Sequence, residues 1–394
     1  MPTFRRQARR FSDVPRTVGL DQPLVLSALG LVGIGIVMVA STSVAVAEIY
    51  SVSGWHFLVR HCLFIAFGLA LTFGVFFIPS ARLEWASRLC LAGALILLAL
   101  PFVPGVGIEV NGATRWINLG VIRFQVVEGV KLLLIIYVAG YLARRPTLAS
   151  GSLLEALKPL LVGGLVAAIL LQQPDMGSAI VILAIIGGMV WLAGAAWKHL
   201  FVLGLSAVPL VTFAALEPYR LRRVMTFTDP WADPYNSGFQ LVQALIAVGR
   251  GQISGVGLGS SVQKLYYLPE AHTDFIFAVL AEEFGLIGII AVLGMFAVLV
   301  TRIFKIGLKA QSMQRPFAAL VAWGIGLWVG LQALVAIGVN LGLLPTKGLT
   351  LPLIAAGGSS LLMTLLAVGM VLRIGWELDC AELARPRRRR EWTP

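Results

Sequence analysis

Long apolar stretches alternate with shorter polar segments along most of this chain. A helix that crosses a lipid bilayer needs about 20 mainly apolar residues. Ten stretches come close to or exceed that length, and each is expected to form one membrane-spanning helix. The ten predicted spans cover residues 23–46, 56–78, 85–103, 127–143, 156–172, 177–196, 199–216, 275–301, 317–340 and 349–375. The pattern therefore predicts an all-α polytopic membrane protein with about ten transmembrane helices.

The longest polar interval, residues 217–274, separates the seventh predicted span from the eighth. Inside it, apolar residues recur at helical spacing, which predicts a short amphipathic helix lying along the membrane surface. These residues are Phe239, Val242, Leu245, Ile246 and Gly249. A second polar segment, residues 104–126, is also long enough to hold structure of its own.

Composition and charge placement support this topology. Hydrophobic residues make up 58% of the chain and charged residues 13%, whereas a soluble domain carries roughly a quarter charged residues. Most of the 31 Lys and Arg residues lie in the two tails and in alternate loops, which places both termini in the cytoplasm and residues 217–274 outside. The net charge of +12 therefore reflects topology better than nucleic-acid binding. The expected organisation is a basic tail over 1–22, a membrane domain over 23–376 and a basic tail over 377–394.

The cysteines do not have the spacing of a metal site or of a disulfide framework. The three cysteines, Cys62, Cys90 and Cys380, are scattered along the chain, so neither kind of site is suggested. Asp175 is most simply part of a tight turn between two spans. The terminal run Arg387–Arg390 indicates topology, with binding of anionic lipid as the alternative.

Asp274 stands where the long polar interval meets the eighth span. One interpretation is a helix N-cap, because an aspartate before an apolar helix accepts bonds from free backbone N–H groups. The other interpretation is a catalytic role, since His272 and Glu270 lie beside Asp274 at the outward-facing boundary of the membrane. A stripe of small residues at helical spacing follows Asp274 and permits a close neighbour, either a helix or a lipid chain. The stripe consists of Ala278, Ala281, Gly285 and Gly288.

Other ionisable residues fall within or beside the predicted spans. Glu128 and Lys131 are spaced i,i+3 and can pair on one helix face. They form either a buried structural pair or a site in which Lys131 faces a phosphate while Glu128 orients it. Glu282 and Glu283 lie two turns below Asp274, and we expect them to have a structural or coupling role.

Several basic residues face outward, against the usual topological bias. They are Arg115, Arg123, Arg220, Arg222, Arg223, Arg250, Lys264 and Lys347. An anionic ligand such as a pyrophosphate would account for them, because guanidinium groups match phosphate oxygens. Pairing with nearby acidic residues is the alternative.

Four segments carry a resemblance to a known family. They are LPEAHTDFIFAVLAEEFG (268–285), EPYRLRRV (217–224), DPWADPYNSGFQL (229–241) and LPTKGLTLPLI (344–354). The chain resembles the SEDS family of shape, elongation, division and sporulation proteins, and its division members more than its elongation members. Ala271 before His272 and the stretch Pro345–Thr350 favour the division branch.

The resemblance implies a peptidoglycan glycosyltransferase that polymerises lipid II at the division septum of the bacterial inner membrane. It implies inverting transfer with undecaprenyl pyrophosphate as the leaving group, and Asp274 as the catalytic residue. The residues expected to bind the substrate or its pyrophosphate are Lys131, Glu128, Arg115, Arg220, Arg223, Lys264, His272 and Lys347. No dedicated metal site is expected, although a divalent cation such as Mg²⁺ or Mn²⁺ could take part. The implied partners are the class B penicillin-binding transpeptidase of the septum and the divisome activators.

This sequence departs from the family pattern in two places. Val126 and Val127 follow Gln125, and Gly129 follows Glu128, where the family usually reads Gln-Pro-Ser/Ala-Glu. Ala355 and Ala356 precede Gly357 where Ser-Tyr-Gly-Gly-Ser is usual. The residues are also compatible with three other functions. These are a lipid II flippase or transporter that uses the intramembrane charges, an elongation polymerase of the same family, and a non-catalytic division scaffold.

Overall fold

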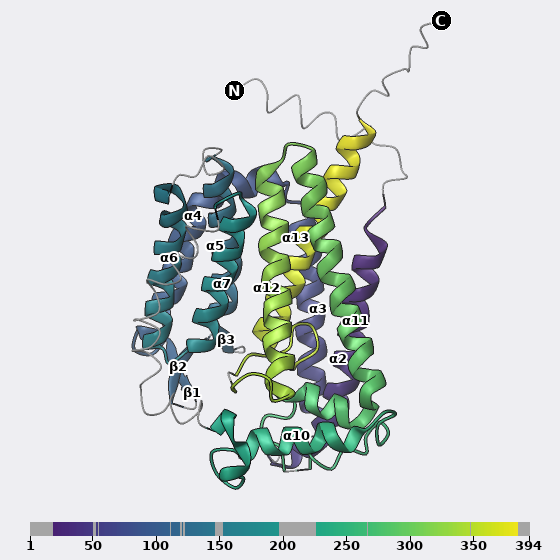
Figure 1. Ribbon diagram of the computed structural model, residues 1–394. Helices are drawn as coiled ribbons and strands as arrows, with labels where there is room; N and C mark the ends of the chain where they lie inside the picture. Colours follow the sequence, from purple (N-terminus) through teal and green to yellow (C-terminus); the bar gives the residue numbers. More distant parts are fainter. Residues whose placement is uncertain are drawn as a thin grey trace, which may run out of the picture.

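The computed structural model is a bundle of long, roughly parallel helices with one short helix lying across its end (Figure 1). It describes residues 19–49, 53, 55–110, 112–118, 120, 123–145, 153–196, 226–265, 267–346 and 348–384. Those residues contain eight helices long and apolar enough to cross a membrane, and a shorter apolar helix, α7. The bundle helices are α2 Gln22–Ile49, α3 His56–Phe76, α4 Ser80–Ala99, α5 Val126–Ala143, α6 Leu153–Gln172, α7 Met176–Leu192, α11 Ile276–Ser312, α12 Pro316–Asn340 and α13 Gly358–Leu383.

Nine of the ten predicted spans are confirmed as helices, and the tenth, residues 199–216, lies outside the described residues. Two helices continue past their predicted ends, α11 to Ser312 and α13 to Leu383, so the tail expected from residue 377 begins as helix. Lys309 stabilises these extensions, because its Nζ lies 2.7 Å from Asp379 Oδ1. The start of α2 and the end of α13 lie at the same end of the bundle (Figure 1).

The predicted start of the last span is wrong. The span was expected from residue 349, but α13 begins at Gly358 and residues 349–357 form an irregular loop. Pro352 lacks the N–H that a helix needs and disfavours helical backbone in the residue before it. The loop is instead fixed by its own bonds, among them Ala356 N–H to the carbonyl of His272 at 3.0 Å. The apolar residues of this stretch are therefore buried without being helical.

A small sheet forms within the polar segment 104–126, and the all-α prediction did not include it. Its strands are β1 Gly107–Val110, β2 Ala113–Asn118 and β3 Arg123–Gln125, in the order β1-β2-β3 with both pairs antiparallel. The register places Ile117 opposite Phe124. A short 3-10 turn, η1 Leu100–Phe102, leads from α4 toward the sheet. Because β3 runs directly into α5, the sheet is anchored to the centre of the bundle.

The core of the bundle lies around α5 and α12, which have the most deeply buried spans. α5 packs against α4 and α12, while α12 also contacts α7 and α11. α3 pairs with α13, and α2 pairs with α11. The large fully buried side chains Trp328 and Lys131 face each other at the centre, with Nζ 5.0 Å from the ring centroid.

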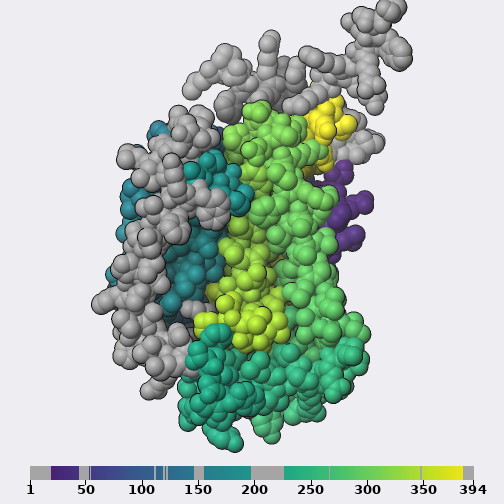
Figure 2. Space-filling view, in the orientation of Figure 1, coloured from purple at the N-terminus to yellow at the C-terminus, as the bar shows by residue number. Residues whose placement is uncertain are grey.

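The predicted amphipathic helix is confirmed as α10 Phe239–Gly251, and a short turn η3 Pro230–Ala232 precedes it. α10 lies across the end of the bundle opposite the start of α2 (Figure 1) and packs mainly against α11. Its buried face differs from the predicted one: of the five predicted positions only Val242 is buried, together with Leu241, Ala244 and Ala247. In Figure 2 the green surface of residues 226–274 covers that end of the bundle, below the yellow-green residues that follow α12.

α11 is interrupted at Gly285, whose backbone has φ 62° and ψ −158°. The loop after α10 inserts its backbone into this break. Val256 N–H bonds to the carbonyl of Glu282 at 3.0 Å, and Leu286 N–H bonds to the carbonyl of Gln252 at 2.9 Å. A Cβ on Gly251 would lie 1.9 Å from the carbonyl oxygen of Ala281. Two residues of the stripe, Ala281 and Gly285, therefore pack closely against the end of α10 and the loop that follows it.

Candidate active site

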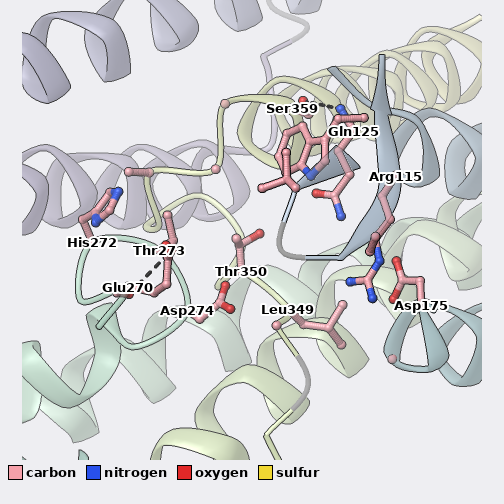
Figure 3. A pocket seen from close by; sticks show the side chains of 18 of the residues that line it. Arg115, Gln125, Asp175, Glu270, His272, Thr273, Asp274, Leu349, Thr350 and Ser359 are labelled. Atoms are coloured by element: carbon pink, nitrogen blue, oxygen red, sulfur yellow. Dashed lines mark hydrogen bonds between the residues drawn. The ribbon is translucent and has the colours of Figure 1, made fainter. Parts of the chain in front are cut away.

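A cavity of about 810 Å³ opens at the end of the bundle where α10 lies. Its wall combines α3, the three-stranded sheet, the α6–α7 turn, the segment before α11 and the loop before α13. Figure 3 shows Asp274, Thr350 and Leu349 on one side of this space, with Arg115 and Asp175 on another. Segments distant in sequence thus bring three carboxylates and three arginines to one cavity.

Asp274 lies one residue before the N-cap of α11 and is half-buried. The N-cap is Phe275, which makes no side-chain cap bond. Among the bonds of the first turn, Ala278 N–H pairs with Asn340 Oδ1 at 3.0 Å. The Asp274 side chain points into the cavity toward Thr350 (Figure 3), and a Cβ on Gly348 would lie 3.4 Å from its Oδ2. This geometry favours chemistry over capping.

Three arginines line the same cavity: Arg60 from α3, Arg115 from β2 and Arg123 from β3. Arg115 is the one among them that the sequence predicted to bind substrate. Its Nε donates to the carbonyl of Gln173 at 2.9 Å, and its Nη2 donates to the carbonyl of Pro174. These bonds hold the guanidinium against the α6–α7 turn, leaving an ordered positive group at the cavity wall.

Asp175 caps α7, as its predicted turn position allows. Its carboxylate accepts from Ser178 N–H at 3.1 Å and from Ser178 Oγ at 2.8 Å. It also lines the cavity near Arg115 (Figure 3). In the part of the chain that the structure describes, no three His, Cys, Asp or Glu side chains are placed to hold a metal ion.

His272, also predicted to bind substrate, lies in the cavity wall with its ring packed on Phe57 at 5.2 Å between centroids. Beside it, Thr273 Oγ1 donates to Glu270 Oε2 at 2.7 Å. Burial of the ring lowers the pKa of His272 below its usual 6.5; Glu270 opposes this shift and Arg60 adds to it. The imidazole is therefore held in its neutral form more strongly than a free histidine.

The lowered pKa of His272 predicts acid-sensitive stability. The unfolded chain takes up this proton near pH 6.5 and the folded chain only at lower pH, so stability is lost as the pH falls below about 6.5. We expect His272→Gln to reduce the fall in Tm between about pH 7.5 and about pH 5 by roughly 1–3 °C. Thermal unfolding in detergent at both pH values measures it, and an equal fall in the two proteins would contradict it.

Glu128 and Lys131 form a buried ion pair at the centre of the bundle. Lys131 Nζ lies 2.8 Å from Glu128 Oε1 and 2.6 Å from Gln332 Oε1, and both charged residues are at most 2% exposed. Gln332 Nε2 in turn donates to the carbonyl of Thr350 at 3.0 Å. Neither member of the pair is among the cavity-lining residues. The geometry thus favours the structural interpretation, with an effect on the cavity through the Thr350 loop.

Lys264, predicted to bind substrate, lies outside the cavity. It is 7% exposed, and its Nζ lies 2.8 Å from Glu283 Oε1 and 2.8 Å from Ser41 Oγ. The physical reason is the neighbouring buried acid, which attracts the ammonium inward. Glu282 is likewise engaged, since it accepts from Val262 N–H at 3.1 Å and lies 3.3 Å from Arg250 Nη1. The predicted structural role of the two glutamates is consistent with these contacts.

Three predicted substrate-binding residues, Arg220, Arg223 and Lys347, lie outside the described residues. Conversely, the predicted site residues did not include Arg60, Arg123, Thr350 or Ser359, although all four line the cavity. Arg123 was named only among the outward basic residues that an anionic ligand would explain. Arg60 lies one turn into a predicted span, Thr350 falls within a quoted segment, and Ser359 follows that segment. Ser359 Oγ bonds to Gln125 N–H at 2.9 Å, which fastens the sheet to the start of α13.

Comparison with known proteins gives a consistent picture. The sequence model of the FtsW, RodA and SpoVE family, described as cell cycle protein, matches residues 22–379. The "Probable peptidoglycan glycosyltransferase FtsW" of Xanthomonas oryzae pv. oryzae is 48% identical over 387 residues, which are 98% of this chain and 78% of that protein. The protein of the same name from Halorhodospira halophila is 49% identical and covers 91% of each chain.

Two solved structures share the fold. A chain of a peptidoglycan synthase complex, described for its structural coordination of polymerization and crosslinking, is 33% identical with a TM-score of 0.75. That match covers 92% of this chain and 99% of the other. The rod shape determining protein RodA of Thermus thermophilus is 30% identical with a TM-score of 0.65, covering 92% of this chain and 98% of that one.

Proposed function

This chain belongs to the FtsW, RodA and SpoVE family of cell cycle proteins, and from that membership we propose that it is a peptidoglycan glycosyltransferase embedded in the membrane. The observation that carries the proposal is the position of Asp274. Its carboxylate enters a large cavity at the end of the bundle (Figure 3), and three arginines line the same cavity. A base and an anion-binding wall are what sugar transfer from a lipid pyrophosphate requires.

The proposed substrate is lipid II, which supplies both donor and acceptor sugars. Asp274 acts as general base and takes the proton from the 4-hydroxyl of the acceptor N-acetylglucosamine. The resulting oxygen forms a bond to the anomeric carbon of the donor muramyl sugar, with inversion from α to β. The bond from that carbon to the pyrophosphate breaks, and the electron pair leaves with undecaprenyl pyrophosphate. Proton, bond and charge thus balance without a further reactant.

The cationic wall has a defined part in this step. Negative charge grows on the pyrophosphate as its bond to the sugar breaks, and Arg115 is already held in place by two carbonyl groups. A donor that is oriented beforehand stabilises developing charge without reorganising at the moment of reaction. Arg60 and Arg123 line the same cavity and add positive charge to it. Of the eight substrate-binding residues expected from the sequence, Arg115 and His272 have positions that support direct contact.

We further propose the cellular setting. The basic tails and inner loops indicate that both termini are cytoplasmic and that the cavity faces outward. Placement at the septum, with a class B penicillin-binding transpeptidase and division activators as partners, follows from likeness to division members of the family. The match to a chain of a peptidoglycan synthase complex supports a transpeptidase partner.

The direct test is polymerisation by the purified protein. We expect it to convert lipid II in detergent or vesicles into glycan strands, separated by gel electrophoresis, and to do so faster with the cognate transpeptidase present. A fluorescent lipid II scrambling assay in the same vesicles tests the transport alternative. Movement of lipid II across the bilayer without polymer would overturn the proposal. Lack of polymer both alone and with the partner, from folded protein, would do the same.

A further inference from the structure

The side-chain amide of Asn340 binds two backbone groups around Asp274. Asn340 is the last residue of α12 and is 1% exposed. Its Nδ2 donates to the carbonyl of Asp274 at 2.8 Å, and its Oδ1 accepts from Ala278 N–H at 3.0 Å. A further bond from Nδ2 reaches the carbonyl of Ala336 within α12, at 2.8 Å. The amide thus joins the end of α12 to both sides of the first turn of α11.

This arrangement supplies what the sequence of α11 lacks. The first N–H groups of a helix have no partner within it and usually bond to an N-cap side chain. The N-cap of α11 is Phe275, which has no polar side-chain atom. The Ala278 N–H reaches the carbonyl of Phe275 at 3.0 Å, and Asn340 adds a second acceptor from another helix while it donates to the carbonyl of Asp274. An amide can do both at once, whereas an apolar side chain can do neither and a carboxylate can only accept.

We propose that Asn340 is a positioning residue that fixes the direction in which the Asp274 carboxylate enters the cavity. The proposal rests on the function proposed above and adds a residue that acts through Asp274 without touching substrate. Asp274 lies in irregular backbone just before α11, so the helix alone does not determine the orientation of its peptide. The carbonyl of the Asp274–Phe275 peptide accepts from Asn340 Nδ2, and the N–H of the same peptide donates to the carbonyl of Glu270 at 3.2 Å. These bonds hold that peptide on both sides, and the Asn340 bond to Ala278 N–H fixes the start of the helix beside it. By fixing the backbone, these bonds set the direction in which the Asp274 side chain leaves it and enters the cavity.

The first test replaces Asn340 by leucine, which has a similar shape but no hydrogen-bonding atom. A displacement of a reacting group by about 1 Å can lower the rate by a factor of about 100. We therefore expect Asn340→Leu to lower kcat for lipid II polymerisation by roughly 10- to 100-fold while KM changes less than about threefold. Rates are compared per folded protein, measured by size-exclusion chromatography and thermal unfolding. Leu334→Ala, on the lipid-facing side of the same helix at 63% exposure, is the control that should keep wild-type activity.

A second variant, Asn340→Asp, decides the question if the leucine variant does not fold. The protonated carboxylic acid can reproduce the two bonds around Asp274, since its carbonyl can accept from Ala278 N–H and its O–H can donate to the carbonyl of Asp274. The ionised form can only accept. We expect the activity of Asn340→Asp relative to wild type to rise several-fold as the pH falls from about 8 to about 5.5, because protonation restores the missing donor. A relative activity that stays constant over this range would overturn the proposal.

The outcomes separate this inference from the proposed function. If wild-type protein makes polymer and Asn340→Leu has the same kcat per folded molecule, the positioning role is wrong and the function stands. The positioning role is equally wrong if KM rises with kcat unchanged, because that pattern indicates loss of binding. If folded wild-type protein makes no polymer, the proposed function itself fails.

Discussion

Asp274→Asn is expected to abolish polymerisation of lipid II by folded protein. Asparagine has nearly the shape of aspartate, so the cavity and the first turn of α11 should be preserved. The amide cannot take a proton from the acceptor hydroxyl, and a positioned general base contributes about 10²- to 10⁴-fold in rate. We therefore expect kcat to fall by at least about 100-fold, with KM close to the wild-type value because the arginine wall remains. Gel analysis of strands made from purified lipid II measures this loss.

Two further variants make the result specific to Asp274. Asp274→Glu keeps the base but moves it by one methylene group, and it should retain a small part of the activity. Glu109→Gln removes an exposed carboxylate on β1, outside the cavity lining, and should leave the rate unchanged. Near-normal polymerisation by folded Asp274→Asn would remove Asp274 from the mechanism.

Lys131→Met is expected to cause the largest loss of stability. Removing one partner of a buried ion pair leaves the other charge without compensation, at a cost of about 3–5 kcal/mol. Here Glu128 would remain 2% exposed after losing the ammonium at 2.8 Å, and Gln332 would lose its bond from Nζ. Methionine keeps the length of the side chain, so packing against Trp328 changes little. We expect Tm in detergent to fall by roughly 5–15 °C.

A double-mutant cycle identifies the cause of that loss. Glu128→Gln combined with Lys131→Met removes both charges, so the double variant should be more stable than Lys131→Met alone. Lys309→Met, which breaks a partly exposed pair with Asp379, should cost at most about 1 kcal/mol. If the double variant is no more stable than the single one, the uncompensated charge is not the cause. Its activity also tests the open alternative for Lys131, because direct contact with phosphate predicts a raised KM in the folded double variant.

The sequence predicted the helices of the bundle well because membrane insertion depends mainly on local apolar length. It was less informative where hydrogen bonding decides the structure. Residues 349–357 are as apolar as a span, yet Pro352 and the bond from Ala356 to His272 make them a loop at the cavity. Similarly, Gly285 reads as one small residue in a helical stripe. Its role in the break of α11 depends on a loop some 30 residues earlier in the chain, which no local pattern reveals.

The residues of the candidate site likewise fall into those that the sequence predicted and those that only the structure reveals. Asp274, Arg115 and His272 were predicted and line the cavity, because their positions in the polar segments locate them without knowledge of packing. Lys264 also lies in a polar segment, but its ammonium pairs with the buried carboxylate of Glu283. Asn340 was not predicted as a site residue, since an asparagine at the end of an apolar helix can have many structural roles. Its importance arises from two backbone groups that only the packed structure brings within reach.

The interruption of α11 at Gly285 has a consequence for how the chain enters the membrane. The amides of Leu286 and Ile287 bond to the carbonyls of Gln252 and Ile253, in a loop that reaches them only after α10 has docked. An unpaired amide in hydrocarbon costs several kcal/mol. The nascent segment should therefore leave the insertion machinery as one continuous helix and exchange its internal bonds for those of the loop at a later stage. Biogenesis of this protein would then include a late remodelling step, in which a continuous helix opens at Gly285 to bind the loop after α10.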